Sequence, residues 1–599
     1  MTATYAKLKY LIGRDLGRFY LLALAVVLQA LLEIAMVGTL APFLSMLMNP
    51  KVVETTGLFA KVYKLGGFHD HASFVTAAGI VVFAIYVTNS VYALFINWVI
   101  IRFSLRQGSN ISTTLFRSYL FQDYLFYLKN NTAELTRVIF QDVARLTDNV
   151  LTPFLMLAAK ITSVLAILLL LSFVNLKITL IAMLVFGGCY GLVYFRIRGF
   201  LARVGELFSH YNNQRFRNVS EAFNGIKDCK IYGIENFYLD NYRYNTHYDA
   251  VTQTRRRTLL ILPKYIMECI AIGGLLLFSV FLYNRGGSAE LVTTITIFAI
   301  AAYRVMPYLQ LIYADVSQIR SNVNALDLIY DSIASLASAT GTALAPGGNV
   351  TFHQALHVSD LSYVYPGTEN RVLDAVTLEI RPNSIVGFAG SSGSGKSTLI
   401  DIILGLLEYR EGEVVIDGVR LTAANARNWQ AKLGYVPQAI HLVDATLAEN
   451  VAFGVSAAQI DRDKVWKVLG DAQLAEFVRS ELPEGIDSLV GERGARLSGG
   501  QRQRIGIARA LYRDPEVLVL DEATSALDGL TEHAFIETVR TLTGRMTILM
   551  IAHRLTSLRY CDNVVLIEQG RIVDSGSYDY MCAHSSYFLT QLGTAAHDG

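Results

Sequence analysis

The segment 384–406 carries residues whose types and spacing are suited to binding phosphate. An apolar run, Ile385–Ala389, leads into a glycine-rich turn and then into a second apolar stretch. The turn follows the pattern G-x-x-x-x-G-K-S, in which glycines let backbone N–H groups surround phosphate oxygens and the next helix contributes its positive end. We therefore expect a strand, a phosphate-binding loop (P-loop) and a helix, with the loop formed by Gly390, Ser391, Ser392, Gly393, Ser394, Gly395, Lys396, Ser397 and Thr398.

Side chains with separate tasks are expected around this loop. Lys396 would reach the β- and γ-phosphates of a nucleotide, and Ser397 would coordinate Mg²⁺. Further along the chain, the apolar string VLVLDE at 517–522 predicts a buried strand that ends in two carboxylates. Asp521 would hold Mg²⁺ through water. Glu522 would act as the general base that polarises the attacking water.

A short string between these two elements, Leu497-Ser498-Gly499-Gly500-Gln501, resembles the signature motif of the ABC ATPases. Further elements match that family's pattern in its order: Tyr365 in YVYPG, Gln438 in YVPQ, Glu492 in VGERG, 525–528 in SALD and His553 in IAHR. The resemblance covers about 350–590 and implies ATP as the nucleotide. It also implies that Tyr365 stacks on adenine, that Gln438 contacts Mg²⁺ and senses the γ-phosphate, and that His553 is the switch histidine of catalysis.

The family resemblance also implies a head-to-tail dimer, with each ATP held between the P-loop of one domain and the signature of the other. Ser498, with the N–H groups of Gly499 and Gly500 at the start of a helix, would hold the γ-phosphate next to Gln501. Because the chain has one such set of motifs, we expect a homodimer.

The first half of the chain reads as a membrane domain. The whole chain is 52% hydrophobic and only 17% charged, and a helix needs about 20 apolar residues to cross a bilayer. The basic N-terminus and the Arg-rich loops after the second and fourth spans predict that the N-terminus and the C-terminal half are cytoplasmic. The six spans are expected at about 20–48, 73–101, 150–174, 176–196, 258–283 and 291–313.

The expected fold is therefore a helical six-span transmembrane domain at 1–334, a linker at 335–350, and an α/β P-loop ABC ATPase domain at 351–599. The aromatic-rich segments 119–127 and 230–240 resemble the two coupling helices of exporter-type ABC proteins. Together these features resemble an exporter half-transporter of the bacterial inner membrane. The segment 55–66 is either a short helix on the outer membrane surface or an ordinary loop.

Some partners are disfavoured by composition. A net charge of +2 gives no bulk attraction to nucleic acid. The five cysteines show no metal-like spacing and are expected to be unpaired thiols.

Charged residues inside the predicted spans are the candidates for substrate contact, because such residues are costly in a bilayer. Four of them are Glu33, Lys160, Glu268 and Arg304. Glu33 and Arg304 lie roughly 20 Å from the starts of their spans. Arg304 would either face a cavity and bind an anionic group such as phosphate, or form a buried pair with Glu33 or Glu268. Glu268 would otherwise pair with Lys264, one helical turn away.

Within the exporters, segments 31–44, 293–307 and 324–333 resemble bacterial lipid-linked oligosaccharide flippases of the PglK type. That resemblance implies a polyprenyl-linked glycan as substrate, with its pyrophosphate on a cavity arginine. Arg304 matches such a position, whereas Leu311 stands where a further arginine would be expected.

Two other hypotheses stay open. The chain would instead export another amphiphile, such as a lipid A precursor, a drug or a peptide. Alternatively it would be an ABC-gated regulatory protein without pumping, although such proteins usually have degenerate ATPase motifs, which are intact here. A protease-fused peptide exporter is disfavoured, because no cysteine-protease segment precedes the first span in this sequence.

Overall fold

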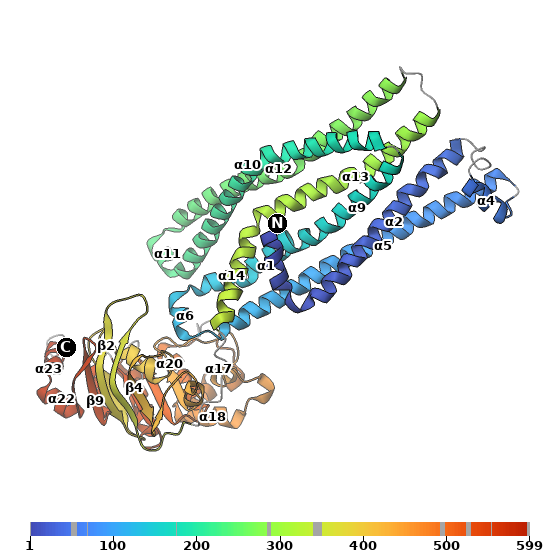
Figure 1. Ribbon diagram of the computed structural model, residues 1–599. Helices are drawn as coiled ribbons and strands as arrows, with labels where there is room; N and C mark the ends of the chain where they lie inside the picture. The colour runs from blue at the N-terminus through green and yellow to red at the C-terminus, as the bar shows by residue number, and fades with distance from the viewer. Residues whose placement is uncertain are drawn as a thin grey trace. The chain divides into compact units, whose positions relative to one another are not determined.

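The computed structural model describes residues 2–48, 57–68, 70–174, 176–283, 289–339, 350–491, 497–522, 529–552 and 554–595. The chain divides into two compact units, shown in Figure 1. The helical unit comprises Met1–Phe121 and Asn130–Thr340, and the ATPase unit comprises Gln122–Lys129 and Gly341–Gly599.

Long helices build the helical unit, as the apolar runs predict. Five of the six segments expected to span the membrane lie within one helix each, and 150–174 comprises the helix Thr152–Val174 and the end of the π-helical turn Thr147–Leu151 before it. Among the described residues, three helical stretches are long and apolar enough to cross a bilayer: Leu16–Leu44, His71–Leu120 and Thr132–Val174. The other three segments remain predictions as spans. The six helices are α2 (Leu16–Met48), α5 (His71–Leu120), α9 (Thr152–Val174), α10 (Leu176–Asn224), α12 (Glu235–Tyr283) and α13 (Ala289–Ser321).

Two groups of helices are visible in this unit (Figure 1). A buried apolar cluster of Met36, Val37, Ile167, Leu171 and Ala301 joins α2, α9 and α13. Helices α10 and α12 run beside each other and carry many exposed apolar side chains on their outer faces. Exposed apolar side chains on long helices are the arrangement expected where lipid replaces water as the solvent.

Short helices complete the helical unit. The N-terminal helix α1 (Thr2–Ile12) packs against α14 (Val323–Ala339). The segment 55–66 contains α4 (Gly57–Leu65), and residues 55 and 56 lie outside the described part. The loop after α5 includes α7 (Thr132–Arg137) and α8 (Val143–Leu146), and α11 (Ile226–Tyr232) lies between α10 and α12.

Three local predictions differ from the structure. The expected linker at 335–350 begins too early, because α14 continues to Ala339 through an alanine-rich stretch that favours helix. The expected coupling helix at 230–240 is interrupted, because Gly233 adopts a left-handed conformation with φ 65° and ends α11. The other coupling segment is partly helical: α6 (Tyr124–Lys129) begins only after a break at 121–123, and it belongs to the ATPase unit.

Two sheets form the ATPase unit. The larger has the order β10-β9-β3-β8-β7-β6, with parallel pairing between all strands except the antiparallel β9–β10 pair. The smaller is antiparallel with the order β2-β1-β4-β5. The strands are β1 (Leu356–Val364), β2 (Arg371–Ile380), β3 (Ile385–Ala389), β4 (Glu411–Ile416), β5 (Val419–Arg420), β6 (Leu433–Val436), β7 (Val517–Asp521), β8 (Thr547–Ile551), β9 (Asn563–Glu568) and β10 (Arg571–Gly576).

The larger sheet has a core on each face, and β3, β7 and β8 contribute side chains to both. Strand β3 is buried at every position, as expected for a central strand of a parallel sheet. Two helices begin at the motifs predicted from sequence: α15 (Lys396–Ile403) and α20 (Gly499–Leu511). The other helices of the unit include α16 (Ala426–Gln430), α17 (Leu447–Val451), α18 (Arg462–Asp471), α19 (Ala475–Ser480), α21 (Gly529–Leu542), α22 (Tyr578–His584) and α23 (Ser586–Ala595).

The turn between β4 and β5 fixes the start of the small sheet. Asp417 and Gly418 have φ of 48° and 80°, the left-handed values of a tight hairpin turn. The Asp417 carboxylate accepts hydrogen bonds from the backbone N–H groups of His353, Gln354 and Ala355 at 2.6, 2.8 and 3.1 Å. One side chain therefore satisfies three donors that precede β1.

We expect Asp417→Ala to lower the free energy of unfolding of the ATPase domain by about 3 kcal/mol, because three charge-assisted bonds are lost and alanine is strained at a positive φ. Urea unfolding of the full chain, followed by tryptophan fluorescence, measures the change. Asp417→Asn keeps an acceptor and tolerates the left-handed conformation, so it should lose less than half as much. Equal stability of the alanine variant and the wild type would refute this role.

Candidate nucleotide site and a polar cluster in the helical unit

The P-loop follows β3 directly, and two of its glycines are required by geometry. Gly390 has φ 138°, and a Cβ there would lie 2.1 Å from the Ile567 carbonyl oxygen. Gly395 has φ 107°, and a Cβ would lie 2.7 Å from the Val372 carbonyl oxygen. Gly395 is also the N-cap of α15, so the loop delivers backbone N–H groups to the positive end of a helix.

Lys396 is folded into the loop that it is predicted to serve. Its ammonium group donates to the carbonyl oxygens of Gly390 and Ser391, both at 2.8 Å, and the side chain is buried. Burial lowers the pKa of Lys396, and the charge of Glu522 opposes this shift. The ammonium group thus sits in a ring of loop oxygens, where an incoming phosphate would offer stronger, charged acceptors.

The two carboxylates of 517–522 lie at the carboxyl edge of the large sheet. Asp521 is the last residue of β7 and pairs with Ile551 of β8, which pairs in turn with Phe388 of β3. The P-loop therefore begins at the same sheet edge as Asp521, with strand β8 between β3 and β7. The Asp521 Oδ2 atom accepts a hydrogen bond of 3.0 Å from the Tyr435 hydroxyl.

Glu522 adopts an unusual backbone conformation, with φ 48°. A left-handed non-glycine residue is strained by about 1–3 kcal/mol, and such strain concentrates at functional sites. Its N–H donates to the Ile551 carbonyl oxygen at 3.1 Å, and its Oε2 accepts from the Gln438 side-chain amide at 2.5 Å. The predicted base and the predicted γ-phosphate sensor are thus in direct contact.

The signature string forms the start of α20, as predicted. Ser498 is the N-cap, and its hydroxyl accepts from the Gln501 N–H at 3.2 Å. Reciprocally, the Gln501 side chain accepts from the Ser498 N–H at 2.7 Å, which completes a capping box. The cap presents Ser498 and the glycine N–H groups together at the positive end of a helix of 13 residues.

Tyr365 lies beside the P-loop. Its hydroxyl is 3.2 Å from the Thr398 hydroxyl, and its ring packs edge-on against Tyr363. Among the other expected site residues, Glu492, 525–528 and His553 lie outside the described residues.

The candidate ligands Asp521, Ser397 and Gln438 suit Mg²⁺, which needs few protein ligands, better than a metal ion whose ligands all come from the protein. The described residues contain no group of three or more His, Cys, Asp or Glu side chains that could hold a metal ion. Mg²⁺ characteristically takes one or two carboxylates and completes its shell with water and substrate phosphates. Asp521, Ser397 and Gln438, which combine one carboxylate with two neutral oxygens, fit that pattern.

Several groups near Asp521 were not singled out by the sequence. Asp401 of α15 is partly buried and faces the charge of Asp521, and these two effects raise its pKa to about 6. Burial and then Asp521 also raise the pKa of Tyr435. Burial, followed by the charges of Asp401, Tyr365 and Asp521, raises the pKa of Tyr124 on α6. In the sequence, Tyr435 lies three residues before Gln438, and this spacing is the signal that could have marked Tyr435 as a residue near the nucleotide site.

The charged residues predicted inside the spans have separate partners. Glu33 is 1% exposed and accepts a hydrogen bond from the Tyr308 hydroxyl, while its Oε2 atom has no hydrogen-bond partner among the described residues. The Arg304 guanidinium donates to the Met36 sulfur at 3.5 Å and lies 5.0 Å from the centre of the Tyr86 ring.

Neither expected ion pair of Arg304 is present, because no carboxylate among the described residues lies within 4.0 Å of its guanidinium. Glu268 pairs with Lys264 at 4.0 Å, as the spacing suggested. Lys160 pairs with Asp315 at 2.6 Å across α9 and α13.

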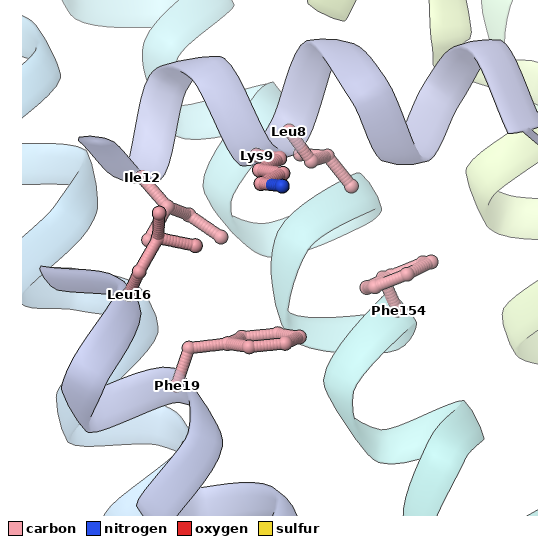
Figure 2. Close-up of a pocket in the computed structure, with 6 residues that line it drawn as sticks. All are labelled: Leu8, Lys9, Ile12, Leu16, Phe19 and Phe154. Atoms are coloured by element: carbon pink, nitrogen blue, oxygen red, sulfur yellow. The ribbon is translucent and has the colours of Figure 1, made fainter.

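A small pocket in the helical unit lies at the bend between α1 and α2 and against α9 (Figure 2). Its lining is apolar except for Lys9 and contains none of the candidate site residues: Leu8, Lys9, Ile12, Leu16, Phe19 and Phe154. Nothing in this pocket combines acid, base or nucleophile, so it adds no chemistry to the site.

Comparison with known proteins agrees with both units. Residues 19–303 match the family model of the ABC transporter transmembrane region, and residues 373–525 match that of the ABC transporter. The chain is 32% identical to an ATP-dependent lipid A-core flippase of Francisella novicida over 420 residues, 66% of this chain and 69% of the relative. It is 34% identical to a protein of the same name from Pseudomonas fluorescens over 387 residues, 63% of this chain and 62% of the relative.

The chain thus spans about two thirds of the length of the curated relatives it matches. A solved structure, that of a bacterial Atm1-family ABC exporter with ATP bound, is similar in fold with a TM-score of 0.77. The similarity covers 96% of this chain and 99% of the other at 22% identity. The chain therefore belongs to the ABC transporter family and joins an exporter-type membrane domain to a nucleotide-binding ABC ATPase domain.

Proposed function

We propose that two copies of this chain form an ATP-driven exporter of the bacterial inner membrane. The exporter moves an anionic, glycan-bearing lipid from the inner to the outer leaflet. The observation that carries the choice of cargo is Arg304, a half-buried guanidinium in the helical unit with no ion pair among the described carboxylates.

The nucleotide site works through binding and orientation. Lys396 holds the β- and γ-phosphates, Tyr365 stacks on adenine, and the loop N–H groups of 390–398 surround the phosphate oxygens. Ser397, Gln438 and Asp521 hold Mg²⁺, which supplies positive charge to the phosphates when it is bound. Glu522 takes a proton from the attacking water, with His553 near the γ-phosphate.

The partner is a second copy of the chain, because the cap of α20 must face the P-loop of another ATPase domain. Exposed apolar side chains on α11 and the start of α12 support this pairing. Ile231, Tyr232 and Phe237 are 66%, 73% and 61% exposed, which is a large apolar surface for a segment on the predicted cytoplasmic side. A groove on the partner's ATPase domain would cover it.

The cargo is inferred from the surroundings of Arg304. An unpaired guanidinium away from bulk water loses several kcal/mol of hydration, and a cation–π contact such as that with Tyr86 restores only about 0.5–2 kcal/mol. A phosphate group would restore far more through bidentate hydrogen bonds. The Oε2 atom of Glu33 on α2 has no hydrogen-bond partner among the described residues, and its negative charge would repel an anionic headgroup. An anion would therefore contact Arg304 on α13 rather than Glu33.

Two glycolipid classes fit this chemistry. Sequence strings in 31–44, 293–307 and 324–333 favour a lipid-linked oligosaccharide. The names of the relatives from Francisella and Pseudomonas instead favour a lipid A-core type of cargo, which was an alternative at the level of sequence. Both classes carry phosphate beside a glycan, and this shared chemistry is the substance of the proposal.

ATP hydrolysis by the protein in nanodiscs tests the proposed cargo. A phosphate-bearing glycolipid should stimulate turnover, whereas the same lipid without phosphate should not. Arg304→Gln should raise the half-stimulating lipid concentration at least about tenfold, because a charge-assisted contact is lost. The half-stimulating lipid concentration of Arg304→Lys should lie between those of the wild type and Arg304→Gln, because lysine keeps the charge and loses the bidentate geometry.

The matched control is Arg117→Gln, which removes an exposed arginine of α5 and should behave like the wild type. Stimulation by lipid A but not by a polyprenyl-pyrophosphate glycan would select the lipid A-core class of cargo, and the reverse result would select the lipid-linked oligosaccharide. Equal stimulation of the wild type and Arg304→Gln by both lipids would reject the proposed phosphate contact of Arg304. Equal stimulation of the wild type by the lipid without phosphate would favour a neutral amphiphile.

A further inference from the structure

The Tyr435 hydroxyl makes a contact that none of the ATP-site motifs explains. Tyr435 lies on β6, which pairs in parallel with β7 so that Tyr435 stands opposite Val519. From there its side chain reaches the end of β7, where the hydroxyl donates to Asp521 Oδ2 at 3.0 Å. The two residues are 86 positions apart, so the sheet alone brings them together.

The same segment of chain provides a donor to each of the two neighbouring carboxylates. Tyr435 donates to Asp521, and Gln438, three residues later, donates to Glu522 at 2.5 Å. A hydrogen bond to one oxygen of a carboxylate limits the orientations that the carboxylate can adopt. Tyr435 engages Oδ2, and this bond restricts rotation of the carboxylate at its exposed end.

The surroundings make this hydrogen bond more valuable than one in open water. In addition to burial, the charge of Asp521 acts on two titratable groups from other elements, the carboxyl of Asp401 on α15 and the hydroxyl of Tyr124 on α6, and raises the pKa of both. Asp401 brings a second carboxyl towards Asp521, and a hydroxyl donor reduces the resulting repulsion. Aromatic rings and partial burial lower the local dielectric, which strengthens hydrogen bonds to charged groups.

We propose that Tyr435 is a positioning residue of the nucleotide site, whose hydroxyl orients the Asp521 carboxylate for metal binding. The inference rests on the proposed function in one respect, the assignment of Asp521 as a Mg²⁺-holding residue. Outer groups that orient a ligating carboxylate typically contribute about 10–100-fold to metal affinity. Tyr435 acts through Asp521 and is not itself a catalytic residue.

Metal binding to the full-length protein in nanodiscs tests the inference without turnover. Mn²⁺ serves as the probe, with a non-hydrolysable ATP analogue present, and the free-ion paramagnetic resonance signal reports binding. Tyr435→Phe should weaken Mn²⁺ binding about tenfold, at the lower end of the expected range. Binding of the analogue in EDTA should stay within about twofold of wild type, because the phosphate loop is untouched.

Controls separate orientation from general damage. Tyr435→Phe keeps the ring, so a loss of packing should not contribute, and thermal unfolding of the variant should match that of the wild type. Tyr580→Phe removes the hydroxyl of an exposed tyrosine on α22 and should leave Mn²⁺ affinity unchanged. Asp521→Asn should lose metal affinity more strongly than Tyr435→Phe.

Two failures can be told apart. If Asp521→Asn binds Mn²⁺ as tightly as the wild type, the metal role of Asp521 in the proposed function is wrong. If Asp521→Asn is impaired but Tyr435→Phe binds Mn²⁺ like the wild type, the proposed function stands and the positioning role of Tyr435 is overturned. Weaker analogue binding by Tyr435→Phe in EDTA would also overturn it, because the defect would then lie outside metal binding.

Discussion

Glu522→Gln is expected to bind ATP with near wild-type affinity and to hydrolyse it at least about a hundredfold more slowly. A general base contributes about 10²–10⁴-fold to a proton transfer, and glutamine cannot accept the proton from water. The strained backbone at φ 48° and the contact with Gln438 hold the side chain at the sheet edge in either variant. Steady-state ATP hydrolysis, together with ATP retained after rapid desalting, measures both effects.

The design separates the base from a general electrostatic effect. Glu476→Gln removes an exposed carboxylate of α19 and should hydrolyse ATP at the wild-type rate. If Glu522→Gln proved as active as that control, another group would have to accept the proton, and the assignment of Glu522 would be wrong. Retained nucleotide with slow turnover would instead indicate a closed dimer arrested before hydrolysis.

Lys396→Ala is expected to weaken ATP binding itself by about 10–100-fold, the equivalent of one strong charge-assisted interaction. Within the described part of the chain, the ammonium group is bonded only to loop oxygens of Gly390, Ser391 and Ser394, so it is available to phosphate once the loop opens. Equilibrium binding of ATP in EDTA isolates this effect from metal binding and from hydrolysis.

Loss of the ammonium group also removes its bonds to the loop carbonyls, so a thermal unfolding measurement must accompany the binding data. Lys396→Met keeps the apolar length of the side chain and should fold like the wild type while binding ATP as weakly as the alanine variant. Lys467→Ala, at an exposed position of α18, is the matched control. Unchanged ATP affinity in both Lys396 variants would refute the predicted phosphate contact.

The ATP-site elements were predictable because each motif contains its own local structure. The apolar run at Ile385–Ala389 coincides with β3, and the glycine of the pattern is the N-cap of α15. Likewise, Ser498 caps the helix that the signature string opens. Short-range sterics and hydrogen bonds decide these features, so they can be read from neighbouring residues.

Element lengths and breaks were less predictable. Hydropathy marks only the apolar part of α5, expected at 73–101, whereas the helix continues through polar residues to Leu120. The break at Gly233 depends on a single left-handed residue in an otherwise helical string. The extension of α14 to Ala339 follows from the high helix propensity of alanine. Propensity is a weak predictor, and the Ser and Thr residues of this segment favour a linker instead.

The decisive side-chain partners were not predictable, because they join distant parts of the chain. Glu33 bonds to Tyr308 across 275 positions, rather than to Arg304 one turn earlier on the same helix. Tyr435 reaches Asp521 across 86 positions through the pairing of β6 with β7. Helix packing and strand order decide such contacts, and neither is encoded in local periodicity.

The most direct test of the account is ATP-dependent movement of a fluorescent, phosphate-bearing glycolipid in sealed proteoliposomes. ATP added outside acts only on copies whose ATPase domains face outward, so lipid should leave the outer leaflet and become protected from an impermeant quencher. We predict a protected fraction that grows with Mg-ATP in the wild type and stays at the protein-free level in Glu522→Gln. Protection that is equal with and without ATP, or equal in the two proteins, would contradict the account.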